Sequence, residues 1–410
     1  MRRFITALLI LAAAAAADTT LSPAELSMAQ ANKMIARNAR DYEAFNALAL
    51  ALARRARETS NVEFYTRAEA ALEKSFAISP GNFDGERIRV WLLLGKHEFA
   101  AALEQAKKLN QRAPDDVTVY GYLTDASVEL GNYPDAEKAA QWMLDLRPGN
   151  IPGVTRAAYL RELFGDVDGA LELMNVAYQS TPPAEAEDGA WILNQMAHLN
   201  LAVGKIDEAE KLLQRALAAF PGYHYALGNL AKVRIQQKRY DEAVALLRQR
   251  YQAAPHAENL YDLAVALGLA GQKNAADAAF TEFEQKSLLE TDKTDNSNHE
   301  LVFYYADHAH QPARALTVAQ REFARRHDAF TLDAYAWALY ANGQYQEARK
   351  QIETALAVGI CDASMLRHAG EIALRAGDRA AAEQYLRRSA ELHAPGSEKA
   401  QAALSVLRSS

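Results

Sequence analysis

The chain has 410 residues, and half of them are hydrophobic, which is enough to build a large packed core. Its formal net charge of −7 argues against nucleic acid as a partner, because that binding depends on clustered Lys and Arg that displace counterions. Cys361 is the only cysteine, so the fold cannot depend on an internal disulfide.

The N-terminus begins MRRFITALLILAAAAAADTT. Arg2 and Arg3 precede an apolar run that ends in alanines, an order typical of a secretory signal cleaved before Asp18. The run is too short to span a hydrocarbon core of ~30 Å, although an uncleaved anchor is the alternative. We therefore expect residues 1–17 to be a signal peptide and the mature chain to carry no transmembrane segment. Its location would be the periplasm in a Gram-negative source, and otherwise extracellular or envelope-associated.

Proline then recurs at a constant interval, at Pro80, Pro114, Pro148 and Pro182. Small residues recur with it, in the order alanine, glycine, alanine and alanine before each of two prolines. These are Ala158, Gly165, Ala170 and Ala177 before Pro182, and Ala197, Gly204, Ala209 and Ala216 before Pro221. A repeat of both spacing and residue type indicates one supersecondary unit copied many times.

Each unit has the pattern of two helices. Apolar residues recur at helical spacing in VTRAAYLRELF and again in VDGALELMNVAY, with Gly165 between them. Glycine ends the first helix because a left-handed backbone costs it little. Alanines such as Ala170, Ala209 and Ala348 would lie where the two helices cross closely. Proline follows the second helix because it cannot continue one.

This pattern resembles the tetratricopeptide repeat family, over residues 41–395. The resemblance implies an all-α fold, a right-handed α-solenoid superhelix of about ten antiparallel helix–turn–helix units. We expect units one to seven in 41–290 and units eight to ten in 291–396. Capping helices would occupy 18–40 and 397–410. The repeat marks lapse in KSLLETDKTDNSNHE, where we expect the superhelix to kink.

A search for chemistry finds no nucleotide-binding, metalloprotease or serine-hydrolase motif. The repeats also leave no room for a second domain, so we expect no enzyme activity, no cofactor and no metal. One segment, 299–310, contains Asp307, His308 and His310 and keeps a metal-dependent module as an alternative. The other interpretation of this segment is a solvent-exposed helix terminus.

In the family, the first helix of each unit lines the concave groove, and its side chains bind the partner. Applied to this chain, the resemblance implies a groove formed by Arg87, Trp91, Asp125, Tyr159, Asn194, His198, Asn229, Lys232, Tyr261, Tyr304, Asp333, Trp337, Arg367 and Glu371. Two tryptophans have a charged neighbour one helical turn away, which is typical of interface anchors. The alternative for every aromatic residue is packing between units.

Some members of the family hold a partner's terminal carboxylate with a clamp of Lys, Asn and Arg. Units five to seven offer Asn194, His198 and Asn229, but then Glu258 and Asp262 where cations are needed, so we expect no clamp. The predicted function is an exported, non-enzymatic scaffold that binds a protein or peptide partner during assembly of an envelope or secretion complex. A solenoid that binds a small ligand or a glycan is the alternative.

The export prediction can be tested on the purified protein. N-terminal sequencing of protein recovered from the cell envelope should begin near Asp18, because cleavage follows the alanine run. Recovery of a chain that still begins at Met1 would contradict it.

Overall fold

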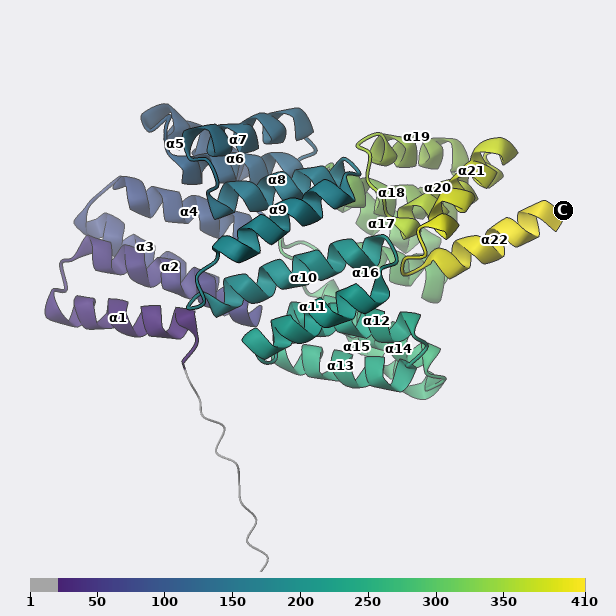
Figure 1. The fold of residues 1–410 in the computed structure, drawn as a ribbon, viewed down its shortest axis with the longest axis horizontal. Coiled ribbons are helices and arrows are strands. Elements are labelled where there is room, and N and C mark those ends of the chain that lie inside the picture. The colour runs from purple at the N-terminus through teal and green to yellow at the C-terminus, as the bar shows by residue number, and fades with distance from the viewer. Residues whose placement is uncertain (1–20, 410) are drawn as a thin grey trace, which may run out of the picture.

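The computed structural model describes residues 21–409, so the predicted signal peptide lies outside the described residues. Within this range all regular structure is helical and no strand is present. Figure 1 shows helical hairpins stacked along the chain, with α1 at one end of the molecule and α22 at the other. The described residues therefore form the all-α solenoid predicted from the repeats.

Ten helices begin a hairpin, and each is preceded by a loop from the previous unit. They are α2 (Tyr42–Thr59), α4 (Phe83–Gly95), α6 (Val117–Glu129), α8 (Ile151–Leu163), α10 (Ala186–Ala202), α12 (His224–Gln236), α14 (Ala257–Leu269), α16 (Asn298–Phe303), α18 (Ala329–Ala341) and α20 (Ala363–Arg375).

Ten further helices return antiparallel to complete the hairpins. They are α3 (Glu63–Ile78), α5 (Phe99–Arg112), α7 (Tyr133–Leu146), α9 (Val167–Ser180), α11 (Ile206–Ala219), α13 (Tyr240–Ala253), α15 (Lys273–Leu288), α17 (Pro312–Phe323), α19 (Tyr345–Leu356) and α21 (Arg379–Glu391). Helices α1 (Pro23–Arg37) and α22 (Ser397–Ser409) cover the two ends of the stack.

The fourth hairpin, α8 and α9, shows why the repeat folds in this way. The Asn150 side chain accepts a hydrogen bond from the Gly153 amide at 2.8 Å and so caps the start of α8. Gly165 ends that helix with φ of 83°. Ala158 and Ala170 are fully buried where the two helices cross. The corresponding Ala209 and Ala348 are also fully buried, which confirms the close-crossing positions inferred from the repeat.

The eighth hairpin is irregular where the repeat marks lapse. Its first helix, α16, ends at Phe303 and continues as one turn of π-helix, η1 (Tyr304–His308). A π-turn leaves the α-helical hydrogen-bond register, which shifts the direction of the following side chains. The constant repeat offset is therefore interrupted from Tyr304 onward.

Contacts between distant hairpins coil the stack onto itself. Hairpins one to five, residues 42–219, form a first coil, and hairpins six to ten, residues 224–391, form a second coil. Ser60 and His256 are 196 residues apart and are hydrogen-bonded, and so are Tyr133 and Ala329. We call this line of contacts the inter-coil seam. Its contacting pairs are Ser60 with His256, His97 with Asp295, Gly131 with His327, Gly165 with Gly359, and Gly204 with Leu392.

Each residue that the first coil contributes to these five pairs is the left-handed residue between the two helices of its hairpin. At Gly165, an added Cβ would lie 2.5 Å from the Gly359 carbonyl oxygen, so the backbones approach more closely than any side chain permits. The corresponding Gly343 of the second coil has no atom within 4 Å of that position. The repeat's glycine thus has a second role in the first coil, which is contact with the second coil.

This difference predicts unequal effects for one substitution at two matched glycines. Gly343→Ala should cost ~1–2 kcal/mol, because alanine must adopt a left-handed backbone there. Gly165→Ala carries the same backbone cost and also forces the Gly359 backbone away, for which ~1–3 kcal/mol more is typical of overpacking. Circular dichroism melts should therefore show a larger loss for Gly165→Ala, and equal losses would contradict the seam.

Candidate functional site

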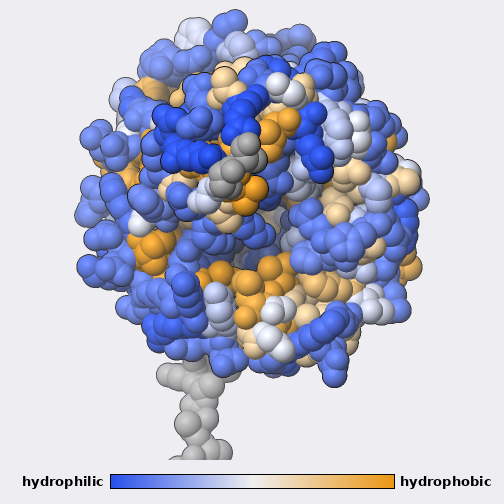
Figure 2. Space-filling view, turned by 90° about the vertical axis from the view of Figure 1, so that its right-hand side faces the viewer, coloured by the Kyte–Doolittle hydropathy of each residue, from blue (hydrophilic) through white to orange (hydrophobic). Residues whose placement is uncertain are grey.

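The first helices of the fifth to tenth hairpins line two adjoining cavities. The Asn194 cavity, of about 380 Å³, lies among α10, α12, α13, α14 and α16. The Lys232 cavity, of about 420 Å³, is lined by α12, α13, α14, η1, α18, α20 and α22. Gly228, Lys232 and Asp262 line both, so the two cavities lie side by side. Figure 2, which faces the end of the molecule where α22 lies, shows a hollow near the middle with hydrophobic residues beside it.

Half of the predicted groove residues line these two cavities. They are Asn194, His198, Asn229 and Lys232 in the Asn194 cavity, and Lys232 with Tyr261, Trp337 and Arg367 in the Lys232 cavity. The Asn229 amide donates a hydrogen bond to the Asn194 oxygen at 2.9 Å, and His198 lies 2.9 Å from Glu162. The repeat offsets thus bring together residues from five hairpins, although their role in binding stays a prediction.

Arg250 is the cavity residue that the sequence analysis missed. It comes from α13, a second helix, and its guanidinium lies over Gly228, where an added Cβ would be 3.0 Å from the Arg250 Cζ. Its Nη1 lies 2.5 Å from Asp262, and its Nη2 lies 3.8 Å from Glu258. Arg250 therefore offsets the two acidic residues on which the absence of a carboxylate clamp was argued.

Glu258 of α14 borders more than one cavity. It lines the Asn194 cavity and also a smaller cavity of about 220 Å³ that adjoins α16 and α18. Its side chain is 47% exposed, and the burial of the remainder, followed by the neighbouring carboxylate of Glu300, raises its pKa to about 7 despite the opposing charge of Arg250.

A buried row of side chains holds Arg367 at the wall of the Lys232 cavity. His368 Nδ1 lies 2.8 Å from Asp333, and its Nε2 lies 2.7 Å from the Arg367 guanidinium. The donating guanidinium requires an unprotonated Nε2, so Nδ1 carries the proton that Asp333 accepts. Glu371 pairs with the other side of Arg367 at 2.7 Å. Asp333 and Glu371, both predicted to be in the groove, therefore hold Arg367 in position, and Arg367 is the residue that lines the cavity.

Trp337 stacks on this row. Its ring centroid lies 4.2 Å from that of His368, and its indole N–H donates to Asp307 at 2.8 Å. Only 5% of Trp337 is exposed, so it is mainly a packing residue that presents one edge to the cavity.

The remaining predicted groove residues lie apart from the two cavities. Arg87 and Asp125 form ion pairs between neighbouring hairpins, with Asp116 and Arg156 respectively. Trp91 is half-buried and packs against the hydrophobic clusters of both the first and the second hairpin.

Tyr159 and Tyr304 have different surroundings. Tyr159 is 36% exposed, and the surrounding protein, followed by the carboxylate of Glu129, raises its pKa well above the usual value. Tyr304 stacks on Phe280, and its hydroxyl donates to Glu284 at 3.3 Å. The π-turn has therefore directed Tyr304 toward α15.

The segment 299–310 has other contacts in place of a metal. Asp307 accepts the Trp337 indole hydrogen bond, and His308 packs on Phe280 with ring centroids 4.5 Å apart. Among residues 21–409, no group of three or more His, Cys, Asp or Glu side chains is arranged to hold a metal ion. In the same range, no helix is long and apolar enough to cross a membrane.

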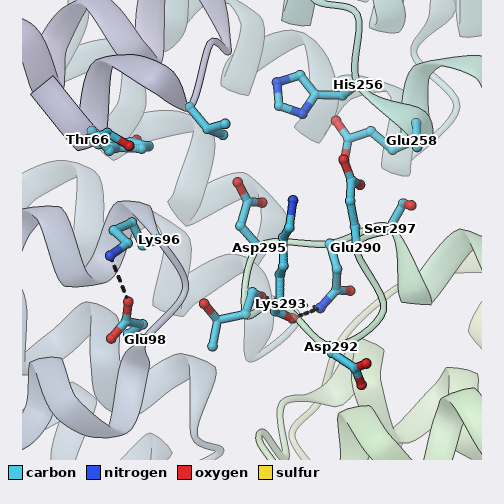
Figure 3. A pocket seen from close by; sticks show the side chains of 15 residues that line it. Thr66, Lys96, Glu98, His256, Glu258, Glu290, Asp292, Lys293, Asp295 and Ser297 are labelled. Carbon is cyan, nitrogen blue, oxygen red and sulfur yellow. Dashed lines mark hydrogen bonds and ion pairs between the residues drawn. The ribbon is translucent and has the colours of Figure 1, made fainter. Parts of the chain in front are cut away.

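A fourth cavity, of about 480 Å³, lies between the two coils. Figure 3 shows Thr66, Lys96 and Glu98 of the first coil on one side and His256 and Glu258 of the second coil on the other. The polar segment 289–297, which joins α15 to α16, runs between them. The stretch in which the repeat marks lapse is therefore a bridge between coils, and His97 Nδ1 lies 3.6 Å from its Asp295.

Ion pairs stabilise the inter-coil seam, and other ion pairs hold the first hairpin against the fifth. Arg57 at the end of α2 pairs with Glu187 and Asp188 at the start of α10. Near α18, Arg326 pairs with Glu129 of the first coil. Acidic residues in the first turn of α10 also suit the positive end of its dipole. The first hairpin is therefore held against the fifth, and the third against the ninth.

Comparison with known proteins agrees with this architecture. Tetratricopeptide repeat family models match residues 200–267 and 334–397. The structure of the human IFIT1 dimer with m7Gppp-AAAA is similar in fold, with a TM-score of 0.53, 14% identity, and coverage of 89% of this chain and 85% of that one.

Two bacterial structures match half of this chain more loosely. PilW, described as a widely conserved type IV pilus biogenesis factor, has a TM-score of 0.43 and 13% identity, covering 50% of this chain and 93% of its own. Pseudomonas aeruginosa pilF has a TM-score of 0.40 and 13% identity, with 50% and 90% covered. No curated protein matches the sequence.

Ten consecutive helical hairpins around interior cavities define an α-solenoid. The repeat spacing and the two family matches identify its class further. The chain belongs to the tetratricopeptide repeat family.

The seam should weaken in acid because of His224. This side chain is 3% exposed, and its Nε2 lies 3.1 Å from the Ser60 hydroxyl of the first coil. Burial lowers its pKa from 6.5 to about 4, helped by the charges of Arg250 and His256 and opposed by a hydrogen bond to the Arg57 carbonyl. The unfolded chain therefore takes up a proton at a pH where the folded one does not, and stability falls as pH drops below 6.5.

By pH 5 this loss should reach about 2 kcal/mol. Thermal melts at pH 7 and pH 5 should show a smaller pH effect in His224→Asn than in the unchanged protein. His310→Asn, at an exposed histidine with a left-handed backbone that asparagine tolerates, is the control and should keep the full effect. An unchanged pH effect in His224→Asn would contradict this assignment.

Proposed function

We propose that this protein is an exported, non-enzymatic scaffold that holds a segment of a protein partner in the Asn194 and Lys232 cavities. Repeats of this family generally mediate protein interactions. The observation that carries the proposal is the adjacency of the two cavities, whose walls come from the first helices of six hairpins, α13, η1 and the capping helix α22. A channel of this kind binds an extended segment along its length.

The chemistry of the walls supports a peptide segment. Asn194, Gln195 and Asn229 offer amide groups that can both donate and accept, as a peptide backbone requires. Tyr261 and Ile235 offer apolar surface for side chains. The inter-coil seam limits access from the side, so a segment with a free end or a flexible loop fits better than a folded domain.

The export proposal rests on the N-terminal sequence alone, with its basic residues, apolar run and alanine-rich end. We propose a periplasmic location in a Gram-negative source, and otherwise an extracellular or envelope-associated one. The role would be assembly of an envelope or secretion complex.

Two other functions have less support. A small ligand or a glycan could use the same polar and aromatic walls, since aromatic faces and amide groups serve sugars as well as peptides. A metal-dependent module would need Asp307 and His308, but both already contact neighbouring side chains. The experiment below separates the first of these from the scaffold.

Filling the channel should abolish partner capture without unfolding the protein. Gln195 of α10 lines the Asn194 cavity, and Gln214 of α11 in the same hairpin is exposed on the outer face. Gln195→Trp should block the cavity, whereas Gln214→Trp adds the same group outside it. In pull-downs from the envelope fraction, unchanged protein and Gln214→Trp should retain one stoichiometric protein partner, and Gln195→Trp should retain none.

Circular dichroism melts check that Gln195→Trp remains folded. Capture of no protein by the unchanged chain would overturn the scaffold in favour of a small ligand. Equal capture by Gln195→Trp and Gln214→Trp would place the binding surface elsewhere.

A further inference from the structure

We propose that the Lys232 cavity binds an acidic side chain, flanked by an apolar one, from within a peptide segment that runs on into the Asn194 cavity. This inference rests on the proposed function, because it names the chemistry that the bound segment presents.

Unpaired positive charge is the first observation. Lys232 of α12 and Lys399 of α22 both line the cavity and are exposed, and neither makes an ion pair or a hydrogen bond within the described residues. Two anions line the same cavity. Asp262 is neutralised by its ion pair with Arg250 at 2.5 Å, whereas Asp307 accepts the neutral Trp337 indole N–H at 2.8 Å and keeps its charge. The two lysines therefore exceed the one remaining anion, and the cavity has an excess of positive charge in a chain whose net charge is −7.

A third cation, Arg367, also lines the Lys232 cavity and is held in a fixed position. Arg367 is 9% exposed, and its guanidinium is held by Glu371 and by His368, which in turn bonds to Asp333. Its buried Nε has no hydrogen-bond partner, although every other buried polar group nearby in this row is paired. Preorganised cations in a partly enclosed site favour an anionic group, because the cost of ordering them is met on folding.

Part of the cavity lining is apolar. Ala231 and Ile235 of α12, Leu247 of α13, and Tyr261 and Val265 of α14 contribute to it. An aliphatic or aromatic side chain can bury its surface there at ~25 cal/mol per Å². The cavity therefore fits two neighbouring side chains of different character, one acidic and one apolar.

The shared residues favour a carboxylate from within the segment. Gly228, Lys232 and Asp262 line both cavities, so a bound segment can extend from one cavity into the other. In the second cavity, Gln195 makes no hydrogen bond within the described residues and is available to a peptide backbone. A segment that passes through both carries its carboxylate on a side chain.

The test is calorimetric titration of the full chain with three short peptides. The first is acetyl-Gly-Leu-Glu-Leu-Gly-amide. The second replaces Glu by Gln and so lacks the charge. The third also has Gln but ends in a free carboxylate. We expect the first to bind at least about tenfold more tightly than the other two.

The preference should depend on the two unpaired lysines. The double variant Lys232→Gln, Lys399→Gln should bind the Glu and Gln peptides equally. The control Lys107→Gln, Lys211→Gln removes two exposed lysines of outer helices, which are likewise unpaired among the described residues, and should keep the preference. All four positions are solvent-exposed, so these variants should melt like the unchanged protein.

Equal binding of the Glu and Gln peptides to the unchanged protein would overturn the inference. So would tightest binding of the free-carboxylate peptide, which would assign the site to a chain end. A Glu preference that survives in Lys232→Gln, Lys399→Gln would also overturn it. If the unchanged protein and this double variant capture a protein partner equally, the site fails while the scaffold function stands. A Glu preference without any captured partner would support the site and overturn the scaffold.

Discussion

The close approach of two coils is the constraint on which the interior depends. A tetratricopeptide stack contacts only neighbouring units by default, and an open superhelix would leave its inner face to solvent. In this protein the hairpin turns of the first coil meet the second coil along a line of backbone contacts, with no room for a Cβ at Gly131 or Gly165. The cavity between the two coils and the bridge by residues 289–297 follow from that approach.

Features encoded by local spacing could be predicted from the sequence. The hairpins, the left-handed glycines and the buried alanines at Ala170 and Ala209 all depend on residues within one repeat. The seam could not be predicted, because Ser60 and His256 are 196 residues apart and no periodic signal connects them. A glycine that allows a left-handed turn looks the same in sequence as one that also contacts another coil.

The residues of the inner surface also divide into those that local spacing predicts and those that it does not. Offsets along the regular first helices selected Asn194 and Asn229, which line the Asn194 cavity, and Trp337, which lines the Lys232 cavity. Arg250 was missed because it enters from a second helix through the space left by Gly228. Tyr304 lies at the start of a π-turn and lines neither of these two cavities. Charge at the groove therefore comes both from the repeat's usual positions, as with Lys232 and Arg367, and from residues outside them, as with Arg250, which only the three-dimensional structure reveals.

The seam has a consequence for the order in which the protein folds. Each hairpin contains mainly local contacts, so hairpins one to five can form before the rest of the chain is available. The contacts between distant hairpins, however, form only after long loops close. Arg57 must meet Glu187, Glu129 must meet Arg326, and Ser60 must meet His256. The N-terminal half should therefore pass through an uncoiled intermediate with exposed turns, and closure of the two coils should be the slowest conformational step.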